Sequence, residues 1–573
     1  MPALFNLETS SRLITIDITM KRQFSLLLYC ILFFPAIHAQ QSRAYEVGKN
    51  IDLFNQVYRT LDEHYVDTLD ANKLIPDAIQ YLLDGLDPYT EYISAEDALS
   101  LQTLTTGKYA GIGAVIRYYK DKDRCMIYEP YENMPAAKAG LQSGDVIIAI
   151  NGKDIGTKGS TATDKYVSHV SNLLRGDPGT TLTVQVERPG VADSLVFEVH
   201  RSNISMQAVP YASMVTDSIG YIKLTTFTKG CADTVRNVLK DLKKQGAQSL
   251  ILDLRDNGGG LAIEAVNLVN LFVPKNKLIL SMKGKCKSSN IKYFSNNTPE
   301  DLHIPLVVLV NGQSASSSEI TCGALQDMDR AVVMGERTFG KGLVQQPHEL
   351  PYGAILKLTT SHYYIPSGRC IQALDYSRRS STGEAYRTPD SLTKVFHTEA
   401  GREVRDGGGI TPDIISKADS LPNLIYYLQA SDQLQNYCNQ YHATHKSIDS
   451  PEKFRITDDD FEAFKKFLLS SDFSYDRQTF KALQELRKIA RREGYEESAQ
   501  TEFNALEKKL THDLDYDLNL WKKEIMQQLD AELCLKYHFR KGYYASLLPH
   551  DSTVHAAVNL LRTPKKYSQI LKK

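Results

Sequence analysis

The chain has 573 residues, of which 42% are hydrophobic and 24% are charged, a composition typical of a folded globular protein. This length is enough for about three to four domains with separate cores. The formal net charge of −1 gives no electrostatic attraction for nucleic acid or for an acidic membrane surface, so we expect neither as a partner.

A candidate export signal lies near the N-terminus. Lys21 and Arg22 precede an apolar run at residues 24–34, and Pro35 and Ala39 follow it. A charged start, a short apolar stretch and a small residue before the cut are typical of a signal peptide. The run is shorter than the ~20 residues that a membrane-spanning helix needs. We therefore expect export to the periplasm or cell envelope, with cleavage near Ala39.

The cysteines do not form a recognisable pattern. Eight are present, one of them (Cys30) inside the predicted signal. The remaining seven are Cys125, Cys231, Cys286, Cys322, Cys370, Cys438 and Cys534. An odd and scattered set predicts neither a disulfide framework nor a zinc site. We expect most of them to be small buried side chains.

The first part of the mature chain changes character at Gly107. Residues 45–105 have apolar side chains at helical spacing and include LDPYTEYIS at residues 86–94, where Asp-Pro indicates a turn. Short strands are predicted after that, at residues 109–116, 125–130 and 145–152, followed by a helix at residues 166–174 and a last strand at residues 181–187. The segment from residue 109 to 187 is therefore expected to be a small, mostly β domain.

A glycine-rich loop opens this β segment. Gly111 and Gly113 lie in YAGIGAVI, and such a loop can direct successive amide groups at the terminal carboxylate of a peptide. The glycines alone would be explained as well by a tight turn. The order of strands and helix, together with AGLQSGD at residues 139–145, resembles a PDZ domain. The resemblance implies peptide-binding roles for Tyr109, Ala110, Gly111, Ile112 and Gly113.

Residues 205–375 alternate strands and helices. A strand is predicted at residues 220–227, a helix at 231–246 and a buried strand at 249–260 that ends in glycines. This alternation predicts a parallel sheet. The glycines lack the GK[ST] ending of a phosphate-binding loop, so they are better explained by the end of a strand.

A candidate nucleophile lies where the next strand meets a helix. The apolar run at residues 305–311 predicts a buried strand, and SASSSEITCGALQD at residues 314–327 predicts the helix. Ser316 is at the junction, where backbone amides and the positive end of the helix dipole favour a developing negative charge. A second strand at residues 331–335 leads to Lys341, which has a glycine on each side.

Lys341 can act as a base only when it is neutral. Its pKa, ordinarily about 10.4, must therefore fall through burial or neighbouring positive charge. Phe339, Leu343 and Val344 supply apolar atoms around it. A lysine in such a turn would by itself be expected to be exposed, and its pairing with Ser316 favours the catalytic interpretation.

Together, SASSSE at residues 314–319 and FGKGLVQQ at residues 339–346 resemble the C-terminal processing peptidases, also called tail-specific proteases. The resemblance implies that Ser316 attacks, that Lys341 is its base and that Gln345 orients the lysine. It implies oxyanion donors at Gly258 or Gly259 and at Ser317. The chain departs from the family pattern at Ser317, where alanine is commoner, and at Leu343, where a small or hydroxyl residue is commoner.

The resemblance also implies the fold and the partners. We expect a multidomain α/β protein whose crotonase/Clp-protease-like core carries an inserted PDZ domain, with helical segments before and after. Peptide-bond hydrolysis through an acyl-enzyme would need no metal and no organic cofactor, and the substrates would be exported proteins or peptides with free, apolar C-terminal tails. Five parts are predicted: upstream residues and signal peptide (1–39), helical segment (40–105), PDZ domain (106–202), catalytic core (203–417) and C-terminal helical domain (418–573).

The last part has apolar spacing near 3.6 residues, which predicts helices at residues 458–469, 478–493, 499–510 and 518–537. Its basic residues Arg487, Lys488, Arg491 and Arg492 are flanked by Glu485 and Glu493, which argues against nucleic-acid binding. We expect it to serve packing, homodimer formation or docking of an envelope adaptor.

Three other functions are compatible with parts of the sequence. A Ser-His-Asp hydrolase would use His348, His362 or His397, although the G-x-S-x-G elbow is absent around Ser316. A non-catalytic PDZ adaptor would bind protein tails in the envelope without cutting them. A crotonase-like acyl-CoA enzyme shares the expected core fold but fits poorly with export.

Overall fold

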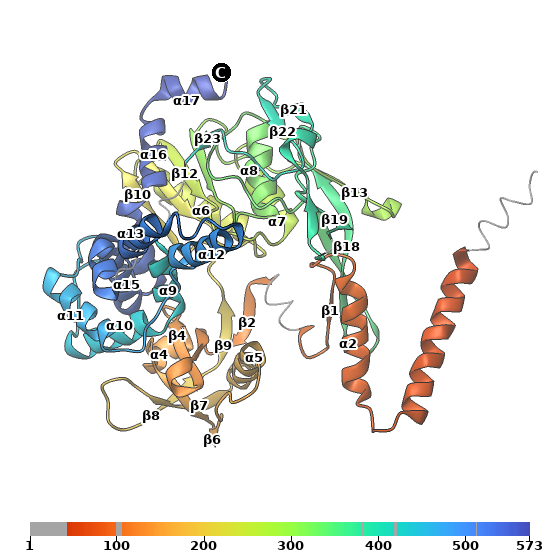
Figure 1. Cartoon of the computed structure of the whole chain (residues 1–573). Helices are drawn as coiled ribbons and strands as arrows, with labels where there is room; N and C mark the ends of the chain where they lie inside the picture. The colour runs from red at the N-terminus through yellow and green to blue at the C-terminus, as the bar shows by residue number, and fades with distance from the viewer. Residues whose placement is uncertain (1–42, 99–105, 381, 417–420, 511–512, 573) are drawn as a thin grey trace, which may run out of the picture. The chain divides into compact units, whose positions relative to one another are not determined.

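The computed structural model describes residues 43–98, 106–380, 382–416, 421–510 and 513–572 (Figure 1). The predicted signal peptide lies outside the described residues. The chain divides into two compact units, one up to Gly85 and one from Leu86 to the end. In the described part, no helix combines the length and the apolar character that crossing a membrane requires. The predicted domain boundaries stay a prediction.

The first unit is described from residue 43 and is helical. It contains a helix at residues 43–64 and α2 (Ala71–Asp84). The Asp70 side chain caps α2 by accepting a hydrogen bond from the Asn72 amide at 3.0 Å. Many apolar side chains of this unit, including Ile51, Leu53 and Val57, are exposed.

Within the second unit, residues 108–205 form a small β domain. Its sheet has the order β3-β4-β5-β7-β8, with β6 paired to β5. The elements are β2 (Lys108–Gly111), β3 (Ala114–Tyr119), β4 (Arg124–Pro130), α4 (Pro135–Ala139), β5 (Val146–Ile150), β6 (Lys153–Asp154), α5 (Thr163–Leu174), β7 (Thr181–Glu187), β8 (Leu195–His200) and β9 (Ser202–Ser205).

Two predictions for this domain were wrong. Residues 109–116 are not one strand, because the chain turns at Ile112 and Gly113, where Gly113 has a φ of 71°. The half before the turn, β2, pairs with β9 instead of joining the sheet. The strand at residues 181–187 is also not the last, since β8 follows it and pairs with it.

The central sheet has the order β10-β11-β12-β15-β16-β23. Its strands are β10 (Tyr211–Thr216), β11 (Ile219–Lys223), β12 (Ser249–Asp253), β15 (Leu306–Val310), β16 (Val332–Gly335) and β23 (Ile414–Ile415). All neighbours from β11 to β23 are parallel, which confirms the pairing predicted from the strand and helix alternation, and β10 is antiparallel.

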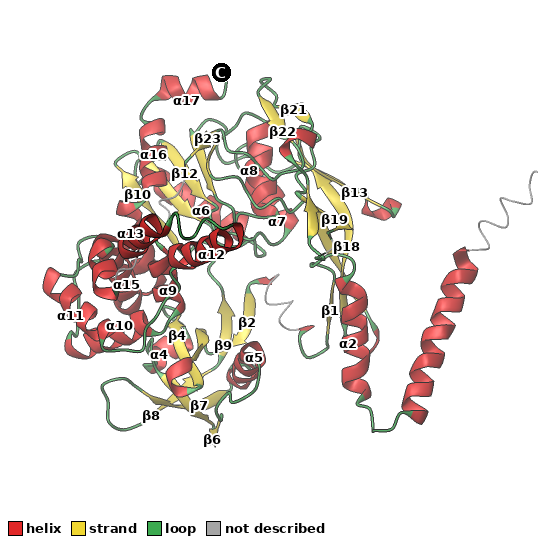
Figure 2. Cartoon of the chain, in the orientation of Figure 1, coloured by secondary structure: helices red, strands yellow, loops and turns green. Residues whose placement is uncertain are grey.

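Both faces of this sheet are covered, as the helices and strands of Figure 2 show. Leu252 and Val308 face a core shared with α6 (Cys231–Lys244), α7 (Ala262–Asn270) and α8 (Ser317–Asp327). Ile251 and Val307 face the other side, where α16 (Ser552–Leu561) and α17 (Pro564–Ile570) pack. Burial on both faces explains why these strands are continuous apolar runs.

A second, antiparallel sheet lies in the same unit. Its order is β1-β18-β13-β14, and β17 also pairs with β18. The strands are β1 (Glu91–Ile93), β13 (Leu278–Gly284), β14 (Lys292–Phe294), β17 (Leu343–Glu349) and β18 (Ile355–Tyr364). Because β18 pairs with β1 and with β17, the LDPYT segment before β1 and the lysine loop before β17 both lead into this sheet. Two hairpins complete the core, β19 (Leu374–Arg379) with β20 (Ala385–Arg387) and β21 (Val395–His397) with β22 (Glu403–Arg405).

The remaining residues form a helical domain around a core that includes Phe461, Phe464 and Leu529. Its helices are α9 (Asn423–Ala430), α10 (Gln433–Thr444), α11 (Asp458–Leu469), α12 (Gln478–Glu493), α13 (Gln500–Leu510), α14 (Leu514–Leu520) and α15 (Lys522–Leu547). The helix predicted at residues 518–537 is present as α15 from Lys522 onward, but its bounds were wrong, since residues 518–520 belong to α14. The chain breaks at Trp521, and α15 continues past a non-helical kink at His538 and Phe539.

This domain packs against the β domain through polar contacts. Arg117 pairs with Asp432 at 3.1 Å, and Arg540 pairs with the buried carboxylate of Glu129.

The basic residues of α12 form ion pairs within the helical domain itself: Arg487 pairs with Glu507, and Arg491 pairs with Glu496. The homodimer and adaptor roles predicted for the domain stay predictions.

Candidate active site

Ser316 lies at a strained turn between β15 and α8. Its φ is 54° and its ψ is −113°, a backbone conformation that residues other than glycine rarely adopt. Such strain persists only where the surrounding structure enforces it, and it is concentrated at functional sites. The flanking residues Ala315 and Ser317 are buried, whereas Ser316 is half-buried. The turn therefore leaves Ser316 more accessible than the residues on either side of it.

The hydrogen bonds of the neighbouring serines separate them from Ser316. The Ser317 hydroxyl donates to the Gly260 carbonyl at 2.9 Å, and the Ser318 hydroxyl donates to the Asn257 carbonyl at 2.8 Å. Both side chains are fully buried. Of the three consecutive serines, Ser316 is thus the one whose position suits a nucleophile.

The glycines after β12 lie directly against this turn. A Cβ atom on Gly259, whose φ is 102°, would be 2.9 Å from the Ser316 Cβ and 2.9 Å from the Ser317 nitrogen. Only glycine permits this approach. The Gly259 amide donates to Asn257 Oδ1 at 2.9 Å, whereas a Cβ on Gly258 would meet no atom within 4 Å. This geometry favours Gly258 over Gly259 as a donor to a bound oxyanion.

A buried carboxylate joins the serine turn to the lysine loop. Glu319, on the first turn of α8, is fully buried. Its Oε2 accepts hydrogen bonds from the amides of Ser316 and Lys341, each at 2.9 Å. Its Oε1 accepts from the Thr338 hydroxyl at 2.5 Å and from the Gly340 amide at 2.8 Å. Because one oxygen binds both amides, the backbones of Ser316 and Lys341 are held next to each other.

The sequence interpretation missed Glu319, although a signal for it was present. A serine at the N-cap followed by glutamate three residues later is the capping-box pattern, in which the glutamate bonds to the N-cap amide. Burial raises the pKa of Glu319 to about 7, while the Thr338 hydroxyl and the three amides act in the opposite direction. Four donors around one carboxyl group favour its ionised form.

Lys341 is half-buried and its pKa is lowered to about 8. Burial is the main cause, and the positive charge of Lys357 acts in the same direction. The carboxylates of Glu91, Asp87 and Glu319 act against it. The lowered value is the property that a lysine base requires.

The Lys341 amine lies over an aromatic ring in this structure. Its Nζ lies 4.0 Å from the centroid of the Tyr89 ring. Within the described residues, no hydrogen bond joins Lys341 Nζ to the Ser316 hydroxyl. The backbones of the two residues are adjacent, because both amides bind the same Glu319 oxygen.

Gln345 was predicted to orient the lysine. In the structure its Nε2 donates to the Thr359 hydroxyl at 3.0 Å, and that hydroxyl donates to Asp87 Oδ1 at 3.1 Å. No hydrogen bond to the Lys341 amine is present in the described chain. Gln345 therefore links β17 to β18 and to the LDPYT segment, close to the lysine loop.

The three candidate histidines are poorly placed for a Ser-His-Asp triad. His348, His362 and His397 are all exposed, whereas Ser316 is half-buried at the start of α8. His348 lies in β17 and His362 in β18, both strands of the second sheet, and His397 lies in β21. None of the three forms a hydrogen bond with Ser316 among the described residues. The structure does not support this alternative.

A groove on the β domain matches the predicted peptide site in part. It has a volume of about 310 Å³ and lies between β3 and α5. Tyr109 and Ile112 line it, together with Ile116 of β3 and Val167 of α5. The other predicted residues shape the loop: Ala110 and Gly111 pair with β9, and Gly113 makes the turn.

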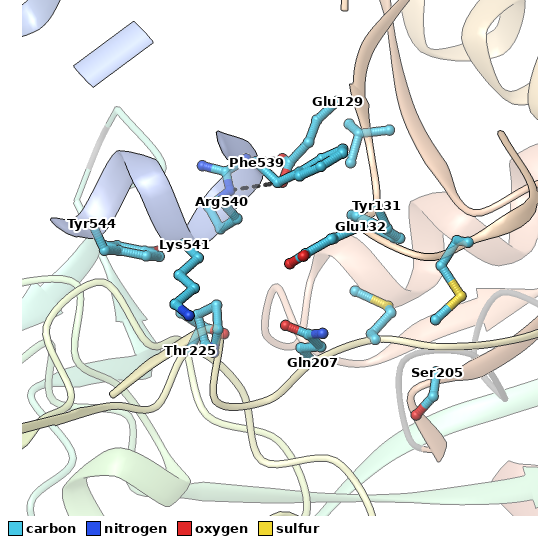
Figure 3. Close-up of a pocket in the computed structure, with 14 residues that line it drawn as sticks. Glu129, Tyr131, Glu132, Ser205, Gln207, Thr225, Phe539, Arg540, Lys541 and Tyr544 are labelled. Atoms are coloured by element: carbon cyan, nitrogen blue, oxygen red, sulfur yellow. Dashed lines mark hydrogen bonds and ion pairs between the residues drawn. The ribbon is translucent and has the colours of Figure 1, made fainter. Parts of the chain in front are cut away.

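A second cavity, of about 260 Å³, is drawn in Figure 3. It lies between the β domain, residues 205–210 and α15, and the Glu129–Arg540 ion pair is on its wall. None of the predicted catalytic residues lines it. This cavity is therefore separate from the serine and lysine site.

Comparisons with known proteins match three parts of the chain. The family models are "Peptidase family S41" at residues 218–376, "PDZ domain" at residues 126–188 and "Probable PDZ-protease, C-terminal helical domain" at residues 424–561. The carboxy-terminal-processing protease of Bartonella bacilliformis is 34% identical over 330 residues, which are 57% of this chain and 73% of the relative. The chain belongs to the carboxy-terminal processing protease family. The resemblance inferred from the SASSSE and FGKGLVQQ segments is thereby confirmed.

Further matches come from the same family. The carboxy-terminal processing protease CtpA of Bacillus subtilis is 33% identical over 58% of this chain and 68% of its own length. The solved photosystem II D1 C-terminal processing protease is 28% identical, covers 59% of this chain and 91% of its own, and has a TM-score of 0.33. As a member of this family the protein is a serine peptidase with a PDZ domain and a C-terminal helical domain, as the sequence predicted. Membership disfavours the non-catalytic adaptor and the acyl-CoA enzyme.

Substitution of Glu319 tests whether its carboxylate positions the site. In Glu319→Ala, three backbone amides and one hydroxyl lose their acceptor, and each unpaired buried donor costs about 1–3 kcal/mol. We expect a lower melting temperature and a fall in kcat of about 10²-fold or more, since small displacements of reacting groups cost that much. The measurements are thermal unfolding and steady-state cleavage of a peptide.

Glu264→Ala is the matched control. Glu264 is also buried, but its carboxylate accepts a hydrogen bond from the Ala232 amide at 3.1 Å, at the start of α6, and none from Ser316 or Lys341 among the described residues. We expect Glu264→Ala to lower the melting temperature and keep kcat. A folded Glu319→Ala protein with the kcat of the parent would contradict the positioning role.

Proposed function

We propose that the protein is an exported endopeptidase that cleaves proteins with free C-terminal tails by means of a Ser316–Lys341 dyad. One observation carries the proposal: a single buried carboxylate oxygen of Glu319 binds the amides of both residues. The strained conformation of Ser316 and the lowered pKa of Lys341 agree with the roles of nucleophile and base.

The reaction follows from these positions. Neutral Lys341 takes the proton of the Ser316 hydroxyl as the oxygen attacks the peptide carbonyl carbon. The amides of Gly258 and Ser317 stabilise the oxyanion of the tetrahedral intermediate. Lys341 then gives its proton to the leaving amine, and an acyl-enzyme remains. A water molecule, deprotonated by Lys341, attacks the ester and releases the new carboxylic acid and the Ser316 hydroxyl.

The groove of the PDZ domain would select substrates by binding their C-terminal tails. An extended tail can pair with β3 while its apolar side chains contact Ile112, Ile116 and Val167. Gly113 has a φ of 71° in the loop before β3, and the amides of such a glycine-containing loop would bind the terminal carboxylate. Binding in the groove would hold the rest of the substrate near the catalytic core and raise its local concentration.

Substitutions of the dyad test the catalytic proposal. Ser316→Ala, Lys341→Ala and Lys341→Arg should each lower kcat by about 10³-fold or more, because the nucleophile or the neutral base is lost and arginine cannot be deprotonated. In the parent, kcat/KM should rise about tenfold per pH unit until pH reaches about 8, since only neutral Lys341 is active. The measurement is peptide cleavage between pH 5 and pH 10.

Ser318→Ala is the control for the run of serines. Its buried hydroxyl donates to the Asn257 carbonyl, whose peptide unit also carries the Gly258 amide, so this variant should lose far less activity than Ser316→Ala, because the nucleophile remains. Activity in folded Lys341→Ala comparable to that of the parent would reject the dyad.

Tail binding can be measured separately from cleavage in the full-length Ser316→Ala protein. A fluorescent peptide with an apolar C-terminus and a free carboxylate should bind at least about tenfold more tightly than its C-terminal amide. Val167→Asp should weaken binding to a similar extent, because it places a negative charge in the groove. Val196→Asp, on the exposed side of β8, is the matched control. Equal affinity for the acid and the amide would contradict the recognition of free tails.

Export can be tested on the N-terminus of the mature protein. When the full-length gene is expressed in a Gram-negative cell, the protein should accumulate in the periplasm and begin near Gln40. Replacing Lys21 and Arg22 by glutamate should keep the uncleaved chain inside the cell, because the positive start of the signal is lost. An intact N-terminus in the periplasmic fraction would show that the predicted cleavage does not occur.

A further inference from the structure

The Lys341 ammonium has an aromatic contact that the catalytic scheme does not use. Its Nζ lies 4.0 Å from the centroid of the Tyr89 ring. Tyr89 comes from the LDPYT segment, which lies before β1 and far from Lys341 in the sequence. A cation at this distance from the ring face is attracted by the quadrupole of the ring, and the attraction grows when both groups are shielded from water.

Tyr89 is held firmly in place. The Asp87 carboxylate accepts hydrogen bonds from the Tyr89 amide at 2.9 Å and from the Thr90 amide at 3.0 Å. The rings of Tyr89 and Tyr376 form a T-shaped pair, with 6.0 Å between the centroids and an interplanar angle of 88°. The same Asp87 carboxylate accepts from the Thr359 hydroxyl, to which Gln345 is bonded. The ring is therefore a fixed surface beside the lysine loop.

We propose that the Tyr89 ring is the docking surface for the protonated Lys341 amine and that it links the charge of this lysine to its position. The inference rests on the proposed Ser316–Lys341 dyad. The ring attracts the ammonium and has no comparable attraction for the neutral amine. Loss of the proton therefore weakens the ring contact and frees the side chain to turn toward Ser316.

Charged groups around the lysine act in both directions. Lys357 of β18 disfavours its charge, and Lys357 is itself paired with Glu91 of β1 at 3.0 Å. The carboxylates of Asp87, Glu91 and Glu319 favour the charge. Tyr89 differs from these charged groups because the ammonium contacts the face of its ring. Removing the ring should thus destabilise the charged form while the carboxylates stay in place.

The test compares Tyr89→Leu with Tyr89→Phe. Leucine keeps an apolar side chain and removes the aromatic ring, so it should destabilise the charged form of Lys341. In the pH profile of kcat/KM, the acid limb should therefore move to lower pH by roughly one unit. Phenylalanine keeps the face and removes only the hydroxyl, which lies 3.4 Å from that of Tyr376. It should leave the acid limb where it is in the parent. Tyr495→Leu, an exposed tyrosine of the helical domain, controls for loss of a tyrosine.

A limb that stays in place or moves to higher pH in Tyr89→Leu would overturn the inference, because the ring would then act only by excluding water. A second measurement needs no activity: the ¹³Cε shift of Lys341 is titrated in the Ser316→Ala background with and without Tyr89→Leu, and the midpoint should fall by the same amount. The dyad is judged independently by Lys341→Ala. If that variant is inactive and both Tyr89→Leu readouts match the parent, only the ring inference fails.

Discussion

The catalytic site depends on one buried carboxylate. Glu319 has no exposed surface, and its two oxygens accept hydrogen bonds from the Ser316, Gly340 and Lys341 amides and from the Thr338 hydroxyl. A buried carboxylate is costly unless donors surround it, and here the donors are the backbones of the two loops that must meet. The requirement to satisfy Glu319 therefore brings together a helix start and a turn that are separate in sequence.

The remaining structure serves to fix those two loops. Ser316 lies in the turn that joins β15 to α8, and β15 is buried on both faces of the central sheet, so the sheet fixes the start of this turn. Lys341 precedes β17, whose pairing with β18 links it to Asp87 through Gln345 and Thr359. Gly259 fits against the Ser316 turn because it has no side chain. Each loop is thus held by a different sheet, and Glu319 joins them.

The sequence predicted the elements with strong periodicity and missed contacts made across the fold. The strands at Ser249–Asp253 and Leu306–Val310 are apolar runs, and the helices at Asp458–Leu469 and Gln478–Glu493 have clear apolar spacing, so local pattern was sufficient. The division of residues 109–116 was missed because one glycine reverses the chain there, and alternation of apolar residues continues through the turn. Ser316 and Lys341 could be identified as candidates from their motifs. The roles of Glu319 and Tyr89 depend on partners distant in sequence, which periodicity does not reveal.

The lysine illustrates how several modest effects set one chemical property. Full burial can lower the pKa of a lysine by about three to five units, whereas that of Lys341 falls from 10.5 to about 8. Half-burial limits the desolvation, and three carboxylates and an aromatic face favour the charged form against the repulsion of Lys357. A base works best when its pKa is close to the working pH, because a lower value would make the amine a weaker proton acceptor. The acidic and aromatic neighbours, which oppose deprotonation, therefore also keep the amine basic enough to take the proton of Ser316.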